Sequence, residues 1–247
     1  MGTVVSFDLR FDDESQRSAM RAAVGDAVTW LHRVDDVFST YRPDSQISRL
    51  GRGELLLADC DGDVAEVLEL CAQVGGESNG YFSSTYGGRL DPTGVVKGWA
   101  VQRASELLRA AGSDRHCVNG GGDMQVAGGP ESGTAWQIGI AHPLHRDALA
   151  SVVSIRDGAV ATSGTAERGA HVFDPFTGRP VQLLASVTVV GADLIRTDAY
   201  ATAALAMGGA ARSWLESRVG YQAFAVAADG SGWWTSGYPQ VGTVPAD

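Results

Sequence analysis

The chain has 247 residues and a mass of 25.8 kDa, so it is long enough to bury a hydrophobic core without help from disulfides or a structural metal. Hydrophobic residues make up 44% and charged residues 19% of the sequence, a balance that is typical of a folded protein and argues against a disordered one. The formal net charge of −10 disfavours binding to nucleic acid or to an anionic membrane surface.

The sequence also predicts the cellular setting. No apolar run approaches the roughly 20 residues that cross a bilayer, and the N-terminus lacks the basic start and apolar centre of a signal peptide. We therefore expect a cytoplasmic protein with no membrane partner. Cys60, Cys71 and Cys117 form no C-x-x-C pair, so neither a disulfide framework nor a zinc site is expected, and the three residues are interpreted as buried thiols.

The first part of the chain alternates helical patterns with breaks. Residues 1–10 alternate in polarity and predict a strand, and apolar residues at helical spacing predict a helix over 14–38. Pro43 breaks this pattern, and Asp44 or Ser45 is placed to cap a short helical turn.

Two further helices are predicted before residue 113. The first covers residues 63–74 and is closed by the glycines at 75–76. After a loop-like segment over 81–90, a second helix begins near Asp91 and Pro92 and ends at Gly112.

From His116 onward the pattern changes to short β-rich runs that are separated by glycine and proline turns. A helix is predicted over 197–219, followed by a hairpin around Asp229 and Gly230. Because the sequence shows no internal repeat or linker, we expect one α+β domain over residues 1–247.

Lys97 is the only lysine in the chain, whereas the other basic side chains are arginines. A compact ammonium can bind a phosphate as a point charge, which the larger planar guanidinium does not reproduce. Asp91, Gly94 and Lys97 recur at a spacing of three at the predicted helix start, where free backbone N–H groups favour an anion. The alternative is that an arginine-rich composition left one lysine by chance.

The run Asn119-Gly120-Gly121-Gly122-Asp123 lies between two strand-like segments, and its glycines would let the backbone approach a ligand closely. A plain β-turn explains the same residues equally well. The run matches neither the dinucleotide-binding nor the P-loop pattern.

Asp198 and Thr202 are four residues apart in a predicted helix and therefore share one face. A carboxylate and a hydroxyl suit Mg²⁺, which takes few protein ligands and completes its shell with substrate phosphates and water. The alternative is that Asp198 caps the first turn of the helix.

His171, in the segment AHVFDPFTGRP, is a candidate general base or ligand contact. A structural histidine that is bonded to a neighbouring loop is the alternative. The other four histidines lie in no distinctive pattern.

Taken in order, nine segments of this chain resemble the FAD:protein FMN transferases, the ApbE-type flavin transferase family. They are MGT, YRPDSQISRL, GYF, DPTGVVKGWA, VNGGGD, WQIGIAHP, ATSG, HVFDPFTGRP and TDAYATAALAMG. The resemblance covers nearly the whole chain and implies an α+β fold with two sub-lobes around an FAD groove. It also implies magnesium-dependent transfer of FMN from FAD to a serine or threonine hydroxyl of an acceptor flavoprotein, with release of AMP.

The resemblance assigns roles to individual residues. It implies that Asp198, Thr202 and the carbonyls of Gly94 and Ala201 bind Mg²⁺. It places on the FAD site Met1, Tyr41, Tyr81, Phe82, Asp91, Lys97 and Val172. His171 or Asp174 in the HVFDP segment is the candidate base for the acceptor hydroxyl, and Lys97 is the candidate catalytic ammonium.

This chain departs from the family pattern in several places. Ser83 replaces an acidic residue, Gly51 replaces an asparagine, and the segments STYGGRL and TAERGA are shorter than usual. Two other functions therefore remain: hydrolysis of FAD or another phosphotransfer from it, and a carrier that binds FAD without turnover. Most bacterial relatives are exported lipoproteins, so a chain that begins at MGT implies a cytoplasmic acceptor.

Overall fold

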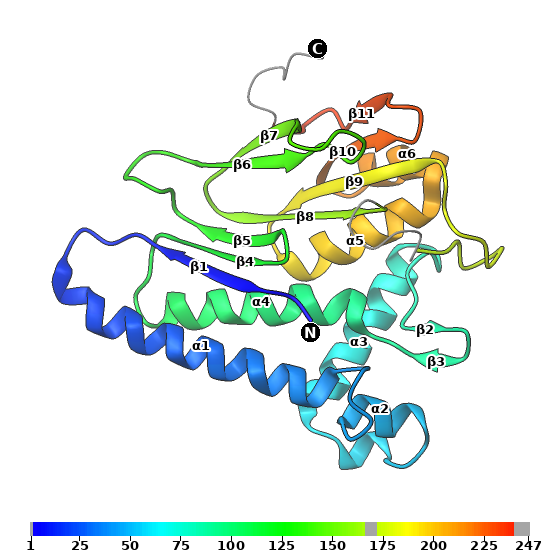
Figure 1. Ribbon diagram of the computed structural model, residues 1–247, viewed down its shortest axis with the longest axis horizontal. Coiled ribbons are helices and arrows are strands. Elements are labelled where there is room, and N and C mark those ends of the chain that lie inside the picture. Colours follow the sequence, from blue (N-terminus) through cyan, green and yellow to red (C-terminus); the bar gives the residue numbers. More distant parts are fainter. Residues whose placement is uncertain (1, 166–171, 240–247) are drawn as a thin grey trace.

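The computed structural model describes residues 2–165 and 172–239 (Figure 1). Its largest element is a seven-stranded antiparallel sheet in the order β1–β4–β5–β8–β9–β10–β11. The strands are β1 (Val5–Leu9), β4 (His116–Gly120), β5 (Asp123–Ala127), β8 (Gly158–Gly164), β9 (Leu184–Gly191), β10 (Gln222–Ala227) and β11 (Gly232–Trp234).

Helices cover one face of this sheet. Helix α4 (Thr93–Ala110) packs on β4 and β5, α5 (Leu194–Met207) packs on β8 and β9, and the two helices contact each other. Helix α1 (Arg17–Phe38) lies on the outer side of α4 (Figure 1). The remaining helices are α2 (Gln46–Gly51), α3 (Gly62–Glu77) and α6 (Ala211–Glu216), with 3-10 turns at Glu14–Gln16, Leu57–Asp59 and Gly208–Ala210.

A separate hairpin of β6 (Trp136–Ala141) and β7 (Leu149–Ile155) covers the opposite face of the sheet. Every second residue of β6 is buried, and Trp136, Ile138 and Ile140 pack with Val126 and Val160 of the central strands. The sheet is therefore apolar on both faces, which fixes the strand register because a slip by one residue would expose these side chains.

Trp99 lies at the centre of the helical layer and is fully buried. Its ring makes edge contacts with Trp30 and Phe38 of α1, at centroid distances of 4.9 and 5.5 Å. Its indole Nε1 donates to Glu66 of α3 over 3.0 Å. Burial of each such large apolar side chain contributes about 1.5–3 kcal/mol, so this cluster holds α1, α3 and α4 together.

The expected α+β fold is confirmed, as are the cap at Ser45 and the hairpin around Asp229 and Gly230. Ser45 accepts a hydrogen bond from the backbone N–H of Ser48 over 3.1 Å and begins α2. Strands β10 and β11 flank the predicted turn. Among the described residues the cysteines form no disulfide; Cys71 is buried, whereas Cys60 and Cys117 are half-buried.

Two of the helices predicted from the sequence have wrong boundaries. Helix α3 continues through the glycines at 75–76 to Glu77, and the chain turns only at Asn79 and Gly80, where φ is 54° and 86°. Gly80 N–H then donates to the carbonyl of Gly75 over 2.8 Å, which satisfies that carbonyl at the helix end.

The predicted helix over 197–219 is two helices. Helix α5 begins earlier, at Leu194, because Asp193 caps it by accepting from Arg196 N–H over 2.8 Å. Gly208, with φ of 58°, ends it before the short α6. The loop predicted over 81–90 also contains a small hairpin of β2 (Thr85–Tyr86) and β3 (Arg89–Leu90).

Within the described ranges, none of the helices has the length and hydropathy that a bilayer crossing requires.

Candidate active site

Helix α4 brings Lys97 to the region between the sheet and α5. The helix begins at Thr93 with Pro92 as its N-cap, slightly later than predicted. Asp91 precedes it, and its carboxylate accepts from the backbone N–H and the hydroxyl of Thr93 over 3.0 and 2.6 Å. Asp91 therefore binds one of the backbone N–H groups at the helix start that were expected to bind an anion. The side chain of Lys97, one turn later, is 22% exposed.

Asp123 reaches Lys97 from β5. The β4–β5 turn consists of Gly121 and Gly122, both with positive φ (65° and 96°), and Gly120 pairs with Asp123 across it. Glycine, asparagine and aspartate favour this two-residue turn, because the backbone is left-handed, with positive φ, at both central positions. Asp123 is 2% exposed, and its Oδ2 forms an ion pair with the Nζ of Lys97.

Asp198 reaches the same ammonium from α5. Its Oδ1 lies 3.2 Å from the Nζ of Lys97, and its side chain is 5% exposed. Because Asp193 caps α5 and Asp198 is the fifth residue of the helix, the alternative in which Asp198 is the cap is wrong. Thr202, one turn further, forms a hydroxyl–hydroxyl hydrogen bond of 3.0 Å with Ser163 at the end of β8.

Two glutamines connect the elements that carry these groups. The backbone N–H of Leu194, at the start of α5, lies 3.0 Å from Oε1 of Gln102 on α4 and 3.0 Å from Oε1 of Gln125 on β5. Gln102 also accepts from Ile195 N–H over 3.3 Å. The N–H groups of a first helical turn have no intrahelical partner, so these bonds stabilise α5 and fix it against α4 and β5.

Among the described residues, two carboxylates share one ammonium at this site. Asp123 and Asp198 are both buried, and the one ammonium of Lys97 lies between them. Removing charges from water is costly unless they are paired, so an additional cation or a further donor would stabilise this arrangement. The carboxylate of Asp198 and the hydroxyl of Thr202 are hard oxygen donors and fit Mg²⁺.

The described residues contain no cluster of three or more His, Cys, Asp or Glu side chains that could hold a metal by themselves. A carboxylate and a hydroxyl, as at Asp198 and Thr202, suit an ion that takes substrate phosphates and water as its other ligands.

Aromatic residues adjoin the start of α4. Phe82 is buried, and a Cβ on Gly94 would lie 2.8 Å from its ring. Tyr81 makes an edge contact with Phe176 at a centroid distance of 4.9 Å, which joins the GYF segment to the HVFDPFTGRP segment. Val172, in the same segment, is buried in the main core.

The other predicted positions are distributed unevenly. Ala201 is fully buried in α5, one residue before Thr202, whereas Tyr41 is 90% exposed. Met1 and His171 lie outside the described residues.

Asp174 has a structural role in its loop. Its Oδ1 accepts from the backbone N–H of Phe176 over 2.8 Å, and its carbonyl accepts from Gly178 N–H. The bond from Phe176 lowers the pKa of the Asp174 carboxyl. A lowered pKa makes a carboxylate a weaker base, so this geometry favours the turn over the proposed catalytic role.

Sequence reasoning missed Asp123, Ser163 and the two glutamines. Asp123 is the last residue of the run at 119–123, whose glycines alone suggested a ligand contact, and Ser163 lies in the ATSG segment. Both residues therefore had a weak sequence signal. No sequence pattern pointed to Gln102 or Gln125.

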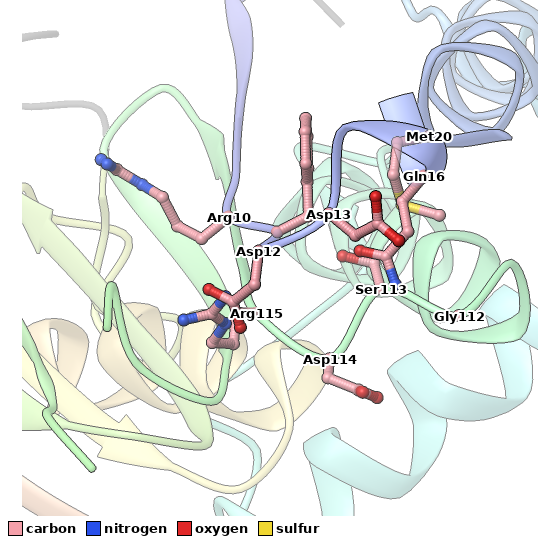
Figure 2. A pocket seen from close by; sticks show the side chains of 10 residues that line it. Arg10, Asp12, Asp13, Gln16, Met20, Gly112, Ser113, Asp114 and Arg115 are labelled. Atoms are coloured by element: carbon pink, nitrogen blue, oxygen red, sulfur yellow. The ribbon is translucent and has the colours of Figure 1, made fainter. Parts of the chain in front are cut away.

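A pocket of about 140 Å³ lies elsewhere, at the opposite end of β1 and β4 from the glycine turn. Figure 2 shows the side chains that line it. Arg10, Asp12, Asp13 and Arg115 line it, and Arg115 forms an ion pair with Asp12 at 2.6 Å. The pocket contains none of the predicted site residues. We therefore place the candidate site at Lys97.

Comparison with known proteins agrees with the resemblance that the sequence motifs show. The sequence model of the ApbE family matches residues 1–89 and 86–225. An FAD:protein FMN transferase of Salmonella typhimurium is 29% identical over 164 residues, which are 62% of this chain and 47% of that protein. One of Rhodobacter capsulatus is 35% identical over 129 residues, 49% of this chain and 24% of that protein. The matches thus span about half or less of these relatives.

Solved structures extend the likeness over nearly the whole chain. The flavin transferase ApbE from Vibrio cholerae has a TM-score of 0.80 at 20% identity, covering 96% of this chain and 94% of that one. The ApbE protein from Thermotoga maritima has a TM-score of 0.83 at 20% identity, covering 95% and 94%. At this identity the likeness establishes the fold.

Proposed function

The chain belongs to the ApbE family, and on that premise we propose that it transfers the FMN half of FAD to a hydroxyl group of another protein and releases AMP. The observation that carries this proposal is the meeting of Lys97, Asp123 and Asp198 from three different elements, with two buried carboxylates at one ammonium. A carrier that only binds FAD has little need for such a concentration of buried charge.

The proposed reaction breaks one bond of a pyrophosphate and forms another to the same phosphorus. The acceptor oxygen bonds to the phosphorus of the FMN half, the bond from that phosphorus to the bridging oxygen breaks, and AMP leaves with the electron pair. Negative charge increases on the leaving oxygen, so a fixed cationic donor lowers the barrier. We assign that role to Lys97.

We further propose that Asp198 and Thr202, with the carbonyls of Gly94 and Ala201, would hold Mg²⁺. When bound, the ion would neutralise phosphate charge at the reacting centre. Asp198 supplies the negative charge of this set, and the hydrogen bond between the hydroxyls of Ser163 and Thr202 orients the Thr202 side chain.

The remaining assignments complete the proposal. We propose that the FAD site is lined by Asp91, Phe82, Tyr81, Val172, Tyr41 and Met1. His171 or Asp174 would take the proton of the acceptor hydroxyl. The turn contacts of Asp174 favour His171. We propose a serine or threonine acceptor in a cytoplasmic flavoprotein.

The test is incubation with FAD and Mg²⁺, with and without a threonine-containing acceptor protein. A transferase releases AMP in step with covalent flavin on the acceptor, which mass spectrometry detects. Release of AMP and free FMN without an acceptor would identify a hydrolase. Binding of FAD without any AMP in either sample would contradict the proposal and leave the carrier function.

A further inference from the structure

We propose that Asp123 is a positioning residue, which holds the ammonium of Lys97 in place for the phosphate groups of the substrate. The inference rests on the proposed function of Lys97. Asp123 contacts Lys97 directly and has no other role in the reaction that we propose.

The position of Asp123 is set by the backbone on both sides. On one side the turn at Gly121 and Gly122 fixes where β5 begins, and the amide oxygen of Asn119 accepts from Gly122 N–H over 2.8 Å. On the other side Oδ1 of Asp123 accepts from the backbone N–H of Thr162 in the neighbouring strand β8 over 2.9 Å. One carboxylate oxygen is thus fixed by the sheet, and the other pairs with Lys97.

Helix α4 is close enough for this contact because Gly120 has no side chain. A Cβ at Gly120 would lie 2.5 Å from a methyl group of Val101, one turn after Lys97. The backbone at Gly120 therefore packs directly against the side chain of Val101 on α4, and the separation of Lys97 from Asp123 depends on that packing.

Lys97 needs a second carboxylate because Asp198 has another proposed partner. A lysine side chain has four rotatable carbon–carbon bonds, and a cation at Asp198 would repel the ammonium. Asp123 is anchored by Thr162 and is buried, so its attraction for the ammonium is little screened by solvent. It would keep Lys97 near the reacting phosphate when Asp198 binds the metal.

The test uses the fact that Lys97 is the only lysine in the chain. Protein labelled with ¹³C-lysine gives the side-chain signals of one lysine residue in NMR, without FAD, metal or turnover. An immobilised side chain separates its two Hε shifts, and a mobile one merges them. Both samples carry Asp198→Asn, because Asp198 also pairs with the ammonium in the metal-free protein. We expect separate shifts while Asp123 is intact and merged shifts once Asp123→Asn is added, a change that keeps the Oδ1 acceptor for Thr162 but loses the charge. Asp8→Asn, a matched change on β1, should leave them separate.

The kinetic arm is a double-mutant cycle with Lys97→Gln. Asp123→Asn should lower kcat for AMP release by about 10- to 100-fold, the range for residues that orient an active group, with little change in KM. In the Lys97→Gln background the same change should cost less than about two-fold, because a group that acts through Lys97 has nothing left to position.

Equal losses in both backgrounds, or Hε shifts that stay separate when Asp123→Asn is added to Asp198→Asn, would overturn the inference. Thermal unfolding of each variant checks that Asp123→Asn is folded, and the NMR arm requires the folded protein only. If the wild type released no AMP while its lysine shifts merged on mutation, the proposed function would fail and the contact between Asp123 and Lys97 would stand.

Discussion

Gly98 on α4 faces Asp198 on α5 so closely that no side chain fits between the two helices. A Cβ on Gly98 would lie 3.2 Å from the Cβ of Asp198 and 2.6 Å from the carbonyl oxygen of Leu194. Gly98 follows Lys97 directly, so this close contact sets the distance between the ammonium and the carboxylate.

Gly98→Ala is expected to destabilise the protein and to reduce AMP release. The new methyl group meets backbone atoms rather than a flexible side chain, so α4 and α5 must separate, at a cost of about 1–3 kcal/mol. Urea unfolding measures the loss. Gly25→Ala is the matched control: Gly25 lies within α1 with open space around its Cβ position, and alanine there should stabilise by about 0.5–1 kcal/mol. Equal stability of Gly98→Ala and wild type would contradict the close packing.

Lys97→Arg should keep the fold and lose about 1–3 kcal/mol of transition-state stabilisation, that is, about 5- to 150-fold in kcat/KM for AMP release. The space between the two buried carboxylates accommodates a compact ammonium. A guanidinium is larger and planar and donates in fixed directions, so it cannot pair with both carboxylates in the same way. Steady-state kinetics with FAD as the variable substrate provides the measurement. Wild-type activity would mean that the single lysine is an accident of composition.

The sequence predicts which residues of this site share one helix face, but not which helices and strands come together to form the site. A spacing of four is enough to place Asp198 and Thr202 on one face of a helix, and both side chains make contacts in the site. The pairing of Lys97 with Asp198 joins residues 101 positions apart, which periodicity cannot predict. Asp123 was missed because its position depends on how closely Gly120 lets α4 approach the hairpin.

Helix ends were predicted less well for the same reason. Glycine is a signal for a helix end, but the glycines at 75–76 tolerate helical geometry, and the chain turns where Gly80 adopts positive φ. Tertiary contacts at Glu77 explain the extra turn: its carboxylate accepts from Arg196 and from the Tyr200 hydroxyl, both on α5, over 3.2 and 2.8 Å.

His116 should make stability depend on pH. The ring is fully buried between Ser105 and Ser113, with nitrogen–oxygen distances of 2.7 and 3.1 Å, and burial lowers the pKa of His116 to about 4. Because the unfolded chain binds this proton more tightly, with a pKa near 6.5, the stabilisation is complete above about pH 6.5 and is lost as the pH falls toward 4.

Urea unfolding at pH 7 and pH 5 should show a loss of about 2 kcal/mol that His116→Gln lacks. The exposed His32 provides the control, since His32→Gln should retain the wild-type pH dependence. If His116→Gln and wild type lose the same free energy between these pH values, His116 is not held neutral by burial.

Asp198→Ala should leave the protein folded and lower AMP release by orders of magnitude. Lys97 keeps Asp123 as a partner in this variant, so no ammonium is left buried and unpaired. The apolar face of α5, including Leu205, is unchanged. The lost carboxylate is the only full negative charge in the proposed metal set, and metal stabilisation of a phosphoryl-transfer transition state contributes several kcal/mol. FAD should still bind, without the dependence on Mg²⁺ seen in the wild type.

Asp193→Ala separates this role from helix capping. Asp193 caps α5 and accepts from the Tyr221 hydroxyl, so its loss should cost about 0.5–2 kcal/mol of stability while a large share of the AMP release remains. Asp198→Ala should show the opposite balance: near wild-type stability and little AMP. Both variants are compared by urea unfolding and by AMP release at saturating Mg²⁺. If Asp198→Ala released AMP at the wild-type rate, the metal assignment would be wrong, because Asp198 is the one full negative charge in the proposed metal set.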